Sequence, residues 1–410
     1  MVEEKISVDE LLERASNSAV DRAIHINEHL TIVANFHSTT RTVHPALDFV
    51  DGKVYIGVFI DSTLLSKKDD KEIVSIRPLH YWITSDREII PTHPEYLLIK
   101  DLRLSSDPIP IPNRWDIQES VDKWLKGKDA DGKSKYPIRA FCSVLNSFLR
   151  YIELPEKSDY VYLTLWTIGT YFHPLFNAYP YIYLGGIKQS GKTKTLTLLS
   201  VLAFNAFLSA NMSTSSIFRL VQNARGTLLI DENEKLSNKD RAQDFRSLLL
   251  SGYKKGAYVY RTEKSTKDRF ISMPFEIYSP KAIANISGLE DVLEDRCKVI
   301  IMKRARNRII ANREINILDE EWQRIRNDLY LLVMNYHSEL SELIARFSEL
   351  SEYDEIVDLL HEKTGIDKKA IMSISAREME LWKPIFILAM FFDQKFSELS
   401  EQSEICELVK

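Results

Sequence analysis

The arrangement of apolar and polar residues changes several times along the chain. Residues 1–30 place apolar side chains, Ala23 and Ile24 among them, at the spacing of a helix. Strand-like runs rich in β-branched and aromatic residues follow at residues 30–36, 53–60 and 96–104. Helical spacing returns from residue 115 to about residue 176, and again beyond residue 314.

A short proline-rich segment separates the first strand-like region from the helical one. Residues 106–114 contain three prolines, which can neither continue a helix nor pair within a central strand. We therefore place a domain boundary near residue 110. The pattern predicts a mixed, β-rich amino-terminal domain (1–110), a helical connector (111–176), a central α/β domain (177–309) and a helical carboxyl-terminal domain (310–410).

The central domain begins with a phosphate-binding motif. A strand-like run at residues 181–184 precedes G-I-K-Q-S-G-K-T, which matches G-x-x-x-x-G-K-[ST], and a helical stretch follows at 195–207. In such a loop, backbone N–H groups and the helix amino terminus surround the phosphates, a lysine supplies charge and a hydroxyl binds Mg²⁺. The motif predicts ATP and Mg²⁺ as cofactors, with Thr193 on the metal. The candidate nucleotide contacts are Gly186, Ser190, Gly191, Lys192, Thr193 and Thr195.

A second apolar run, residues 227–230, ends in two carboxylates, Asp231 and Glu232. Because the carboxyl ends of parallel strands meet at one sheet edge, we expect both acids beside the nucleotide. Asp231 would hold Mg²⁺ through water, and Glu232 would polarise the water that attacks the phosphate. A glutamate in that role favours ATP hydrolysis over transfer to a small acceptor. The alternative is a solvated acidic turn after a strand.

Two more polar residues lie at the ends of strand-like runs. Asn285 follows one run and is a candidate to bond the γ-phosphate or orient the attacking water, although an asparagine there is otherwise a turn residue. Arg296 precedes the next run and is a candidate to reach the nucleotide of a neighbouring subunit. The alternative for Arg296 is a salt bridge to Glu294 or Asp295.

Residues 253–273 alternate as two strands joined by a polar turn. Six basic residues against two acidic ones between positions 253 and 270 predict a β-hairpin with a basic tip. If the tip faces a channel, it would contact the DNA backbone, whereas a solvated charged face is the alternative. Tyr258 and Tyr260 are expected to pack within the hairpin rather than stack on bases. The candidate DNA contacts are Lys264, Lys267, Arg261 and Arg269.

The order of GGIKQSGKT, LLIDE, the hairpin, SPKAIAN and LEDRCKVIIM resembles the AAA+ motor core of superfamily 3 helicases and related replication ATPases of viruses, plasmids and mobile elements. It is also similar, more coarsely, to minichromosome maintenance helicases. The resemblance covers residues 181–302. It implies a P-loop AAA+ core, in which helices flank a parallel sheet, with an all-helical lid.

The same resemblance implies roles for individual residues. Lys192 would bind phosphate, Asp231 would bind the metal and Glu232 would assist hydrolysis. Asn285 would be the first sensor, and Arg296 would be an arginine finger acting in trans. A finger acting in trans implies a ring of identical chains, usually a hexamer, and the hairpin would grip DNA. In the helical domain, Arg377 resembles the lid arginine that contacts the γ-phosphate; the alternative for Arg377 is a helix pair with Glu380.

Charge and cysteine content narrow the picture. The chain has 54 Lys and Arg and 59 Asp and Glu, a net charge of -5. This total excludes a protein that coats nucleic acid with its whole surface, and the charge is divided along the chain, with -11 on residues 314–410 and +6 on residues 1–313. The three cysteines lack zinc-ligand spacing, and we find neither a signal peptide nor an apolar run long enough to cross a bilayer. We therefore expect a cytoplasmic protein without membrane contact.

Residues 1–105 contain no paired-carboxylate primase motif, no His-hydrophobic-His nickase motif and no zinc-binding set. We therefore expect either a separate primase or initiator as partner, or a collar role for this domain. We interpret the chain as an ATP-dependent, ring-forming DNA motor and a replicative helicase of a mobile genetic element. The alternatives are a DNA-packaging or remodelling ATPase that does not unwind, and a nucleotide-switched regulatory ATPase.

Overall fold

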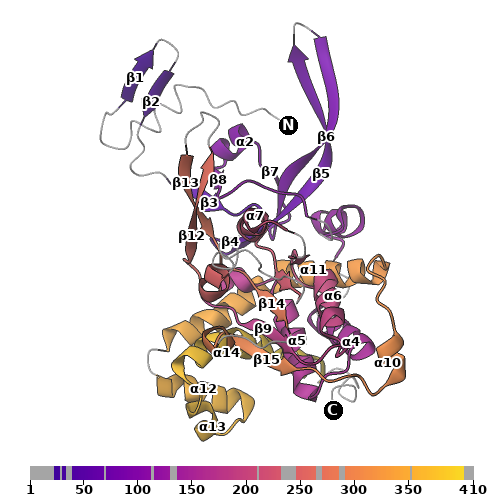
Figure 1. The fold of residues 1–410 in the computed structure, drawn as a ribbon. Helices are drawn as coiled ribbons and strands as arrows, with labels where there is room; N and C mark the ends of the chain where they lie inside the picture. Colours follow the sequence, from indigo (N-terminus) through magenta and orange to yellow (C-terminus); the bar gives the residue numbers. More distant parts are fainter. Residues whose placement is uncertain are drawn as a thin grey trace.

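A five-stranded parallel sheet forms the centre of the molecule, with helices packed on it and a β-rich amino-terminal domain at one end (Figure 1). This α/β architecture is seen in a computed structural model. The structure describes residues 23–27, 30–33, 39–68, 71–111, 115–129, 136–209, 212–231, 246–264, 270–285, 291–350 and 353–400.

The central sheet has the strand order β10-β11-β14-β9-β15, and every neighbouring pair is parallel. Its carboxyl ends therefore lie along one edge. Buried apolar runs such as β9, β11 and β14 are typical of strands covered on both faces. The strands are β9 (Tyr181–Gly185), β10 (Phe207–Leu208), β11 (Leu228–Ile230), β14 (Lys281–Ala284) and β15 (Cys297–Ile301).

Side chains of β9 alternate between two cores, as the period of a strand requires. Ile182 and Leu184 belong to a large core shared with the helices α4, α5, α6, α11 and α14. Tyr181 and Tyr183 belong to a smaller core that includes Phe218 of α7. The sheet is thus covered on both faces. The helices are α4 (Tyr136–Tyr151), α5 (Lys157–Gly169), α6 (Lys192–Leu202), α7 (Thr214–Ala224), α11 (Glu320–Glu349) and α14 (Ala376–Ser400).

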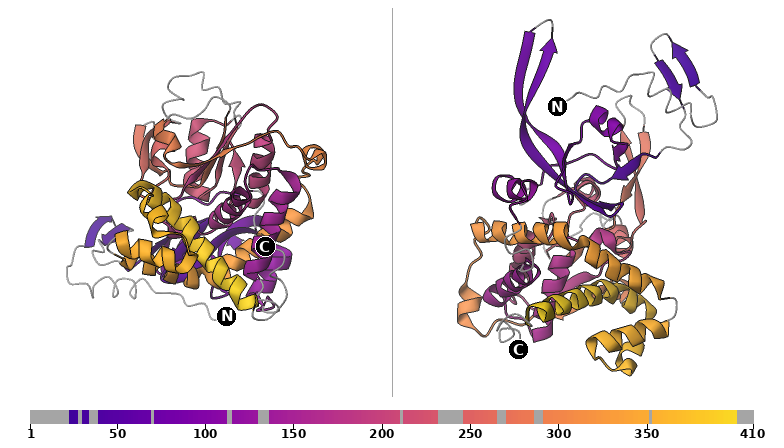
Figure 2. Two further views of the ribbon diagram at one scale, coloured as in Figure 1. Left: turned by 90° about the horizontal axis from the view of Figure 1, so that it is seen from below. Right: turned by 180° about the vertical axis from the view of Figure 1, so that it is seen from behind.

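The helices that precede the sheet pack against those that follow it (Figure 2). α11 lies against α4, and α14 lies against α4 and α5. Ring contacts join the two groups at Phe141–Phe392, with centroids 5.0 Å apart, and at Tyr162–Trp382, 5.3 Å apart. The expected connector and the expected helical domain therefore share one core. Pro384 lies inside α14.

Short helices complete the helical part. None of the helices in the described ranges is long and apolar enough to cross a membrane. These short elements are α2 (Pro94–Ile99), the π-helix η1 (Ile117–Val121), α3 (Asp122–Leu125), the 3-10 helix η3 (His173–Leu175), α9 (Asp291–Glu294), α10 (Arg308–Asn312), α12 (Tyr353–Thr364) and α13 (Lys368–Met372).

The amino-terminal domain is built around a long antiparallel ribbon of β5 (Lys53–Lys68) and β6 (Lys71–Thr84), which stands away from the rest of the molecule (Figures 1 and 2). β4 (Leu47–Val50) and β7 (Ile89–Pro91) flank its base. The other pairs are β1 (Ala23–Asn27) with β2 (Leu30–Val33), antiparallel, and β3 (Arg41–Val43) with β8 (Leu102–Leu104), parallel.

Polar contacts attach this domain to α7. The His44 ring nitrogen Nε2 lies 2.6 Å from the carbonyl oxygen of Gln222. Just beyond the helix, Arg225 donates to an Asp48 carboxylate oxygen at 2.9 Å. The amino-terminal domain is therefore joined to the helix that packs on the second face of the sheet.

Two expectations for the amino-terminal region are wrong. Ala23 and Ile24 lie in β1, not in a helix, and the rest of the expected helix lies outside the described residues apart from β1 and Leu30. The run at 96–104 was expected as one strand but divides into α2 and β8. Pro94 explains the second error, because proline favours the first position of a helix and here follows an extended His93.

Candidate nucleotide-binding site

The phosphate-binding motif forms a tight loop between β9 and α6. Gly186 and Gly191 have φ angles of +136° and +93°, which side chains other than hydrogen rarely allow. A Cβ atom on Gly186 would lie 2.3 Å from the carbonyl oxygen of Met302. The loop is therefore pressed against the end of β15, and glycine is required there.

Lys192 is the first residue of α6, and its ammonium group turns back over the loop. It donates to the carbonyl oxygens of Gly186 at 2.6 Å and Ile187 at 3.0 Å. The residue before the helix, Gly191, offers no side-chain cap. The first N–H groups of α6 and the Lys192 ammonium thus gather positive charge where a phosphate would sit.

Two hydroxyls of the motif are buried in different ways. Thr195 donates its Oγ1 proton to the Gly191 carbonyl oxygen at 3.0 Å, so this side chain is used within its own helix. Ser190 Oγ is buried without a hydrogen-bond partner among the described residues. Thr193, the expected metal ligand, is exposed at the start of α6. Ser190 and Thr193 therefore remain available to a ligand, whereas Thr195 supports the loop.

Asp231 and Asn285 lie along the same sheet edge as the loop. Asp231 follows β11 and Asn285 follows β14, and the Asn285 N–H donates to the Leu184 carbonyl oxygen at 3.3 Å. Both side chains are half-buried. Neighbouring strands lie about 4.8 Å apart, so Asp231 stands roughly 10 Å across the sheet from β9. Asp231 and Asn285 thus follow strands that end at the same edge as the loop, and Glu232 lies outside the described residues.

A basic segment after β15 borders the loop. The sequence did not lead us to expect this segment at the nucleotide site. Arg304 Nε donates to the Lys188 carbonyl oxygen at 3.4 Å. Lys194 on α6 donates to the Ile310 carbonyl oxygen at 2.7 Å, and burial, together with the charge of Arg313, lowers the pKa of Lys194. No local sequence signal marks this contact, because it depends on the pairing of β15 with β9, which brings the residues after β15 to the same edge.

Arg296 lies at the opposite edge, at the amino end of β15. Its guanidinium is buried, donates to the Val292 carbonyl oxygen and stacks over the Tyr253 ring at 5.1 Å. The expected alternative, a salt bridge to Glu294 or Asp295, is not among the ion pairs of the described residues. The side chain therefore packs within its own chain, against Tyr253, which precedes the expected hairpin.

Arg377 also lies away from the loop. Its guanidinium is 3.8 Å from an Asp295 carboxylate oxygen, while Glu380, the alternative partner, pairs with Lys254 at 2.6 Å. Asp295 precedes β15, whose five residues span about 16 Å between the two sheet edges. In this arrangement Arg377 is too distant to contact a nucleotide in the loop of its own chain.

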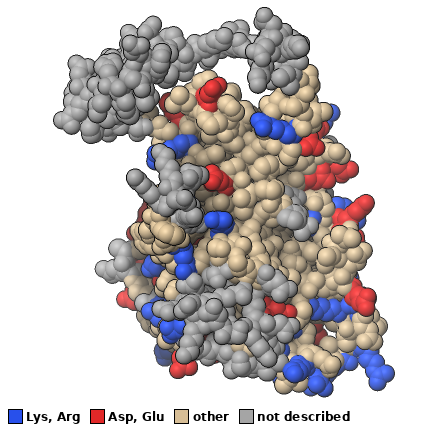
Figure 3. Space-filling model, turned by 45° about the horizontal axis from the view of Figure 1, so that its top comes forward, with Lys and Arg blue, Asp and Glu red and all other residues tan. Residues whose placement is uncertain are grey.

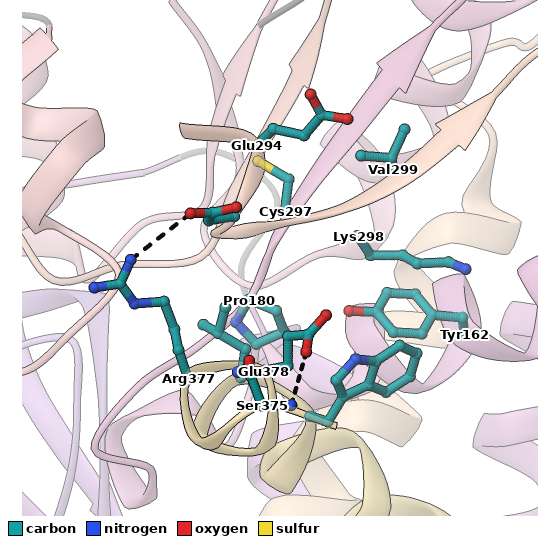
Figure 4. A pocket seen from close by; sticks show the side chains of 12 residues that line it. Tyr162, Pro180, Glu294, Cys297, Lys298, Val299, Ser375, Arg377 and Glu378 are labelled. Atoms are coloured by element: carbon teal, nitrogen blue, oxygen red, sulfur yellow. Dashed lines mark hydrogen bonds and ion pairs between the residues drawn. The ribbon is translucent and has the colours of Figure 1, made fainter. Parts of the chain in front are cut away.

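A cavity of about 770 Å³ separates the amino end of β15 from the beginning of α14. Figure 4 shows Arg377 and Glu378 on one side of it, with Glu294 and Cys297 across from them. Burial raises the pKa of the Cys297 thiol to about 12, and hydrogen bonds from Ser375 lower the pKa of Glu378. The cavity carries both signs of charge and does not adjoin the phosphate loop.

The expected hairpin is present as β12 (Tyr258–Lys264) and β13 (Phe270–Glu276), paired antiparallel with Lys264 opposite Phe270. Lys267 and Arg269 lie outside the described residues, as does the side chain of Lys264. Arg261 does not point to the tip; its guanidinium stacks on the Phe218 ring of α7 at 4.7 Å. This contact attaches the middle of β12 to α7.

One face of the hairpin is aromatic and exposed. Tyr258, Tyr260 and Phe270 share this face by register and are 54%, 68% and 75% exposed. The expectation that the tyrosines pack within the hairpin is therefore wrong. The opposite face is the one that packs, because Phe275 and Arg261 alternate with the tyrosines and meet α7.

The visible surface charge is mixed. On the face drawn in Figure 3, Lys and Arg lie among Asp and Glu, and no broad basic patch forms among the described residues. A contact with nucleic acid must therefore be local on this face.

No family model matches the chain, and no curated protein matches it in sequence. Similar solved structures include the apo C-terminal region of NrS-1, at 12% identity over 70% of each chain and a TM-score of 0.30. Another is the active helicase Cch of SCCmec type IV, at 12% identity, covering 88% of this chain and 79% of that one, with a TM-score of 0.30. A third is the JCV helicase with a bound small molecule, at 14% identity, covering 64% and 79%, with a TM-score of 0.24.

Proposed function

We propose that this chain is an ATP-hydrolysing DNA motor with an AAA+ core, that it works as a ring, and that it is a replicative helicase of a mobile genetic element. One arrangement carries the proposal. Asn285 directly follows β14 beside the phosphate loop, and the amino end of β14 is joined to the β12–β13 hairpin by four residues. The nucleotide site and the candidate DNA contact are thus linked by one buried strand.

The loop residues fit ATP and Mg²⁺. The uncapped start of α6 and the Ser190 Oγ, which finds no hydrogen-bond partner within the described ranges, are groups that phosphate oxygens would satisfy. Lys192, held by two loop carbonyls, would turn to the phosphates, and Thr193 and Asp231 would hold the metal. Bound MgATP supplies the phosphoanhydride bond whose hydrolysis drives movement.

The remaining candidate residues would position the attacking water or stabilise the negative charge that develops on the phosphoryl group. Glu232 would accept a proton from the water, and Asn285 would hold that water or the γ-phosphate by a neutral hydrogen bond. No arginine predicted for the site lies within reach of the loop in its own chain, since Arg296 and Arg377 occupy the opposite sheet edge. We therefore assign both arginines to the nucleotide of a neighbouring subunit, which Arg296 would reach by leaving its contacts with Val292 and Tyr253. This assignment makes the ring necessary for turnover.

The hairpin would contact DNA in the channel of the ring. Lys264, Lys267 and Arg269 would supply the charge that contacts DNA, while Arg261 holds β12 against α7. The exposed Tyr258 and Tyr260 offer flat faces on which bases of a single strand can stack. The amino-terminal domain would act as a collar, with a primase or initiator on a separate polypeptide.

Strand displacement tests this proposal. The purified chain should hydrolyse ATP in the presence of Mg²⁺, hydrolyse it faster with single-stranded DNA, and separate a forked duplex. ATP-driven movement along duplex DNA without strand separation would indicate a packaging or remodelling ATPase instead. Hydrolysis that DNA does not stimulate, together with no salt-dependent DNA affinity, would indicate a regulatory ATPase and refute the motor.

A further inference from the structure

Lys281 is a fully buried lysine at the amino end of β14, with 0% of its surface exposed. Its ammonium donates to the carbonyl oxygens of Gly252 at 3.0 Å, Ile277 at 3.1 Å and Ser279 at 3.0 Å, and contacts Ser279 Oγ at 3.1 Å. The ring of Tyr181 lies 4.9 Å from the nitrogen. Burial lowers the pKa of Lys281 well below its usual value. The described residues place no carboxylate in an ion pair with it.

The carbonyls that Lys281 binds belong to the segments just before and just after the hairpin, which we call its two roots. Gly252 precedes β12, and Ile277 directly follows β13. The two roots also bond to each other, since the Ser279 N–H donates to the Gly252 carbonyl oxygen at 3.2 Å. The ammonium group of Lys281, the first residue of β14, therefore links both roots of the hairpin to this strand.

The other end of β14 reaches the nucleotide site. Four buried residues, Lys281–Ala284, separate the ammonium contacts from Asn285, a length of about 13 Å. β14 is paired with β11 on one side and β9 on the other, and β9 runs into the phosphate loop. Because a close-packed strand that is paired on both sides bends little, a shift at Asn285 would be passed to Lys281.

A second contact meets the same root. Tyr253, next to Gly252, stacks with the Arg296 guanidinium at 5.1 Å. The root of the hairpin thus touches β14 of its own nucleotide site and also the arginine assigned above to a neighbour's nucleotide.

We propose that Lys281 is a positioning residue that couples the nucleotide site to the β12–β13 hairpin by holding both hairpin roots on β14. The inference rests on the proposed function, because it requires a hairpin that binds DNA and a site that hydrolyses ATP. A lysine suits this task, since three carbonyl oxygens converge on one point and an ammonium group has three donors. An apolar residue of the same length would fill the space but leave those carbonyls unsatisfied.

The first test compares Lys281→Met with Lys281→Arg and with Lys254→Met. Lys254 lies beside the same root but is exposed and paired with Glu380, so its variant controls for loss of a nearby charge. Lys281→Met should bind a non-hydrolysable ATP analogue within about twofold of the wild type and keep its DNA-free hydrolysis rate, while DNA stimulation of hydrolysis falls roughly tenfold. Lys281→Arg should recover part of the stimulation, and Lys254→Met should keep it.

The outcomes separate this inference from the function on which it rests. Wild-type DNA stimulation in a Lys281→Met protein that binds nucleotide overturns the coupling role and leaves the motor standing. A wild-type protein that DNA does not stimulate overturns the motor and the coupling together.

A second measurement needs no variant and decides the matter if Lys281→Met does not fold. Hydrogen exchange of the wild-type amides of Ile277 and Ser279 should change about fivefold or more when the ATP analogue binds, because those amides lie at the root that β14 holds. Exchange at both amides that is unchanged by bound analogue overturns the inference.

Discussion

His173 should make the fold sensitive to acid. The residue begins η3, is 1% exposed, and donates from Nδ1 to the Thr170 carbonyl oxygen at 2.8 Å. Nε2 has no hydrogen-bond partner in the part of the chain that the structure describes. Burial is the main cause that lowers the pKa of His173 to about 3; the hydrogen bond to Thr170 raises the pKa, and the nearby positive charges lower it. The folded protein therefore holds this ring neutral under conditions in which an unfolded chain would protonate it.

The sign and the size of the effect follow from the two pKa values. In the unfolded chain the pKa is 6.5, so the full stability is present above pH 6.5 and declines as the pH falls toward the folded pKa near 3. At pH 5 the unfolded ring is about 97% protonated, and the folded ring is almost entirely neutral. The difference of roughly 1.5 pH units, at about 1.4 kcal/mol per unit, lowers the free energy of unfolding by about 2 kcal/mol.

Urea unfolding at pH 7 and pH 5 measures this loss. His173→Asn is the matched variant, because its amide N–H can replace the Nδ1 donor to Thr170 without titrating. Between the two pH values the wild type should lose about 2 kcal/mol more than the variant, since all other titrations are common to both. His361→Asn, at an exposed histidine, should behave as the wild type. Equal losses in the wild type and His173→Asn would refute the reasoning.

The other predictions concern the proposed motor. Gly186→Ala should abolish binding of a fluorescent ATP analogue, because the new methyl group would lie 2.3 Å from a backbone carbonyl at a φ of +136°; normal binding would contradict the loop geometry. Lys192→Ala should weaken the same binding at least about tenfold, with unchanged affinity arguing against a phosphate contact. Arg296→Ala should bind ATP normally but hydrolyse it about a thousandfold more slowly, and normal turnover would exclude the role in trans. Exchange of Lys264 and Lys267 for Glu should weaken single-stranded DNA binding roughly tenfold at low salt, without loss of DNA-free hydrolysis; unchanged affinity would remove the hairpin from the DNA path.

The phosphate loop and the sheet-edge residues could be predicted because their signals are local. Strand, glycine loop and helix follow one another within the motif, and any parallel pairing of the strands places Asp231 and Asn285, which follow their strands directly, at the same edge. The hairpin could be predicted for the same reason, since its alternating residues and its turn lie in one short segment. These features needed no knowledge of distant contacts.

The features that sequence reasoning missed depend on packing between distant segments. The side of the hairpin that faces α7 is decided by Phe218, so the choice between buried and exposed tyrosines was not encoded in the alternation itself. Arg304 reaches the loop only because β15 pairs with β9. Lys281 reads as an ordinary charged residue at a strand start, and its burial follows from the convergence of two roots that lie before and after the hairpin.

The separation of the charged groups between two sheet edges bears directly on oligomeric state. The carboxyl edge holds the phosphate loop, Asp231 and Asn285, while the amino edge holds Arg296 and, through Asp295, Arg377. A phosphoryl-transfer site needs cations close to the developing charge, and a strand length of about 16 Å is beyond the reach of either arginine. If the arginines act on ATP at all, they must act on ATP held by another copy, with each copy presenting its amino edge to the next one's loop. Such a contact joins two different surfaces, and repeated contacts of that kind close into a ring or continue as a filament. Mass measurement with and without ATP would distinguish these outcomes, and a chain that hydrolyses ATP at full rate as a monomer would contradict the assignment of both arginines.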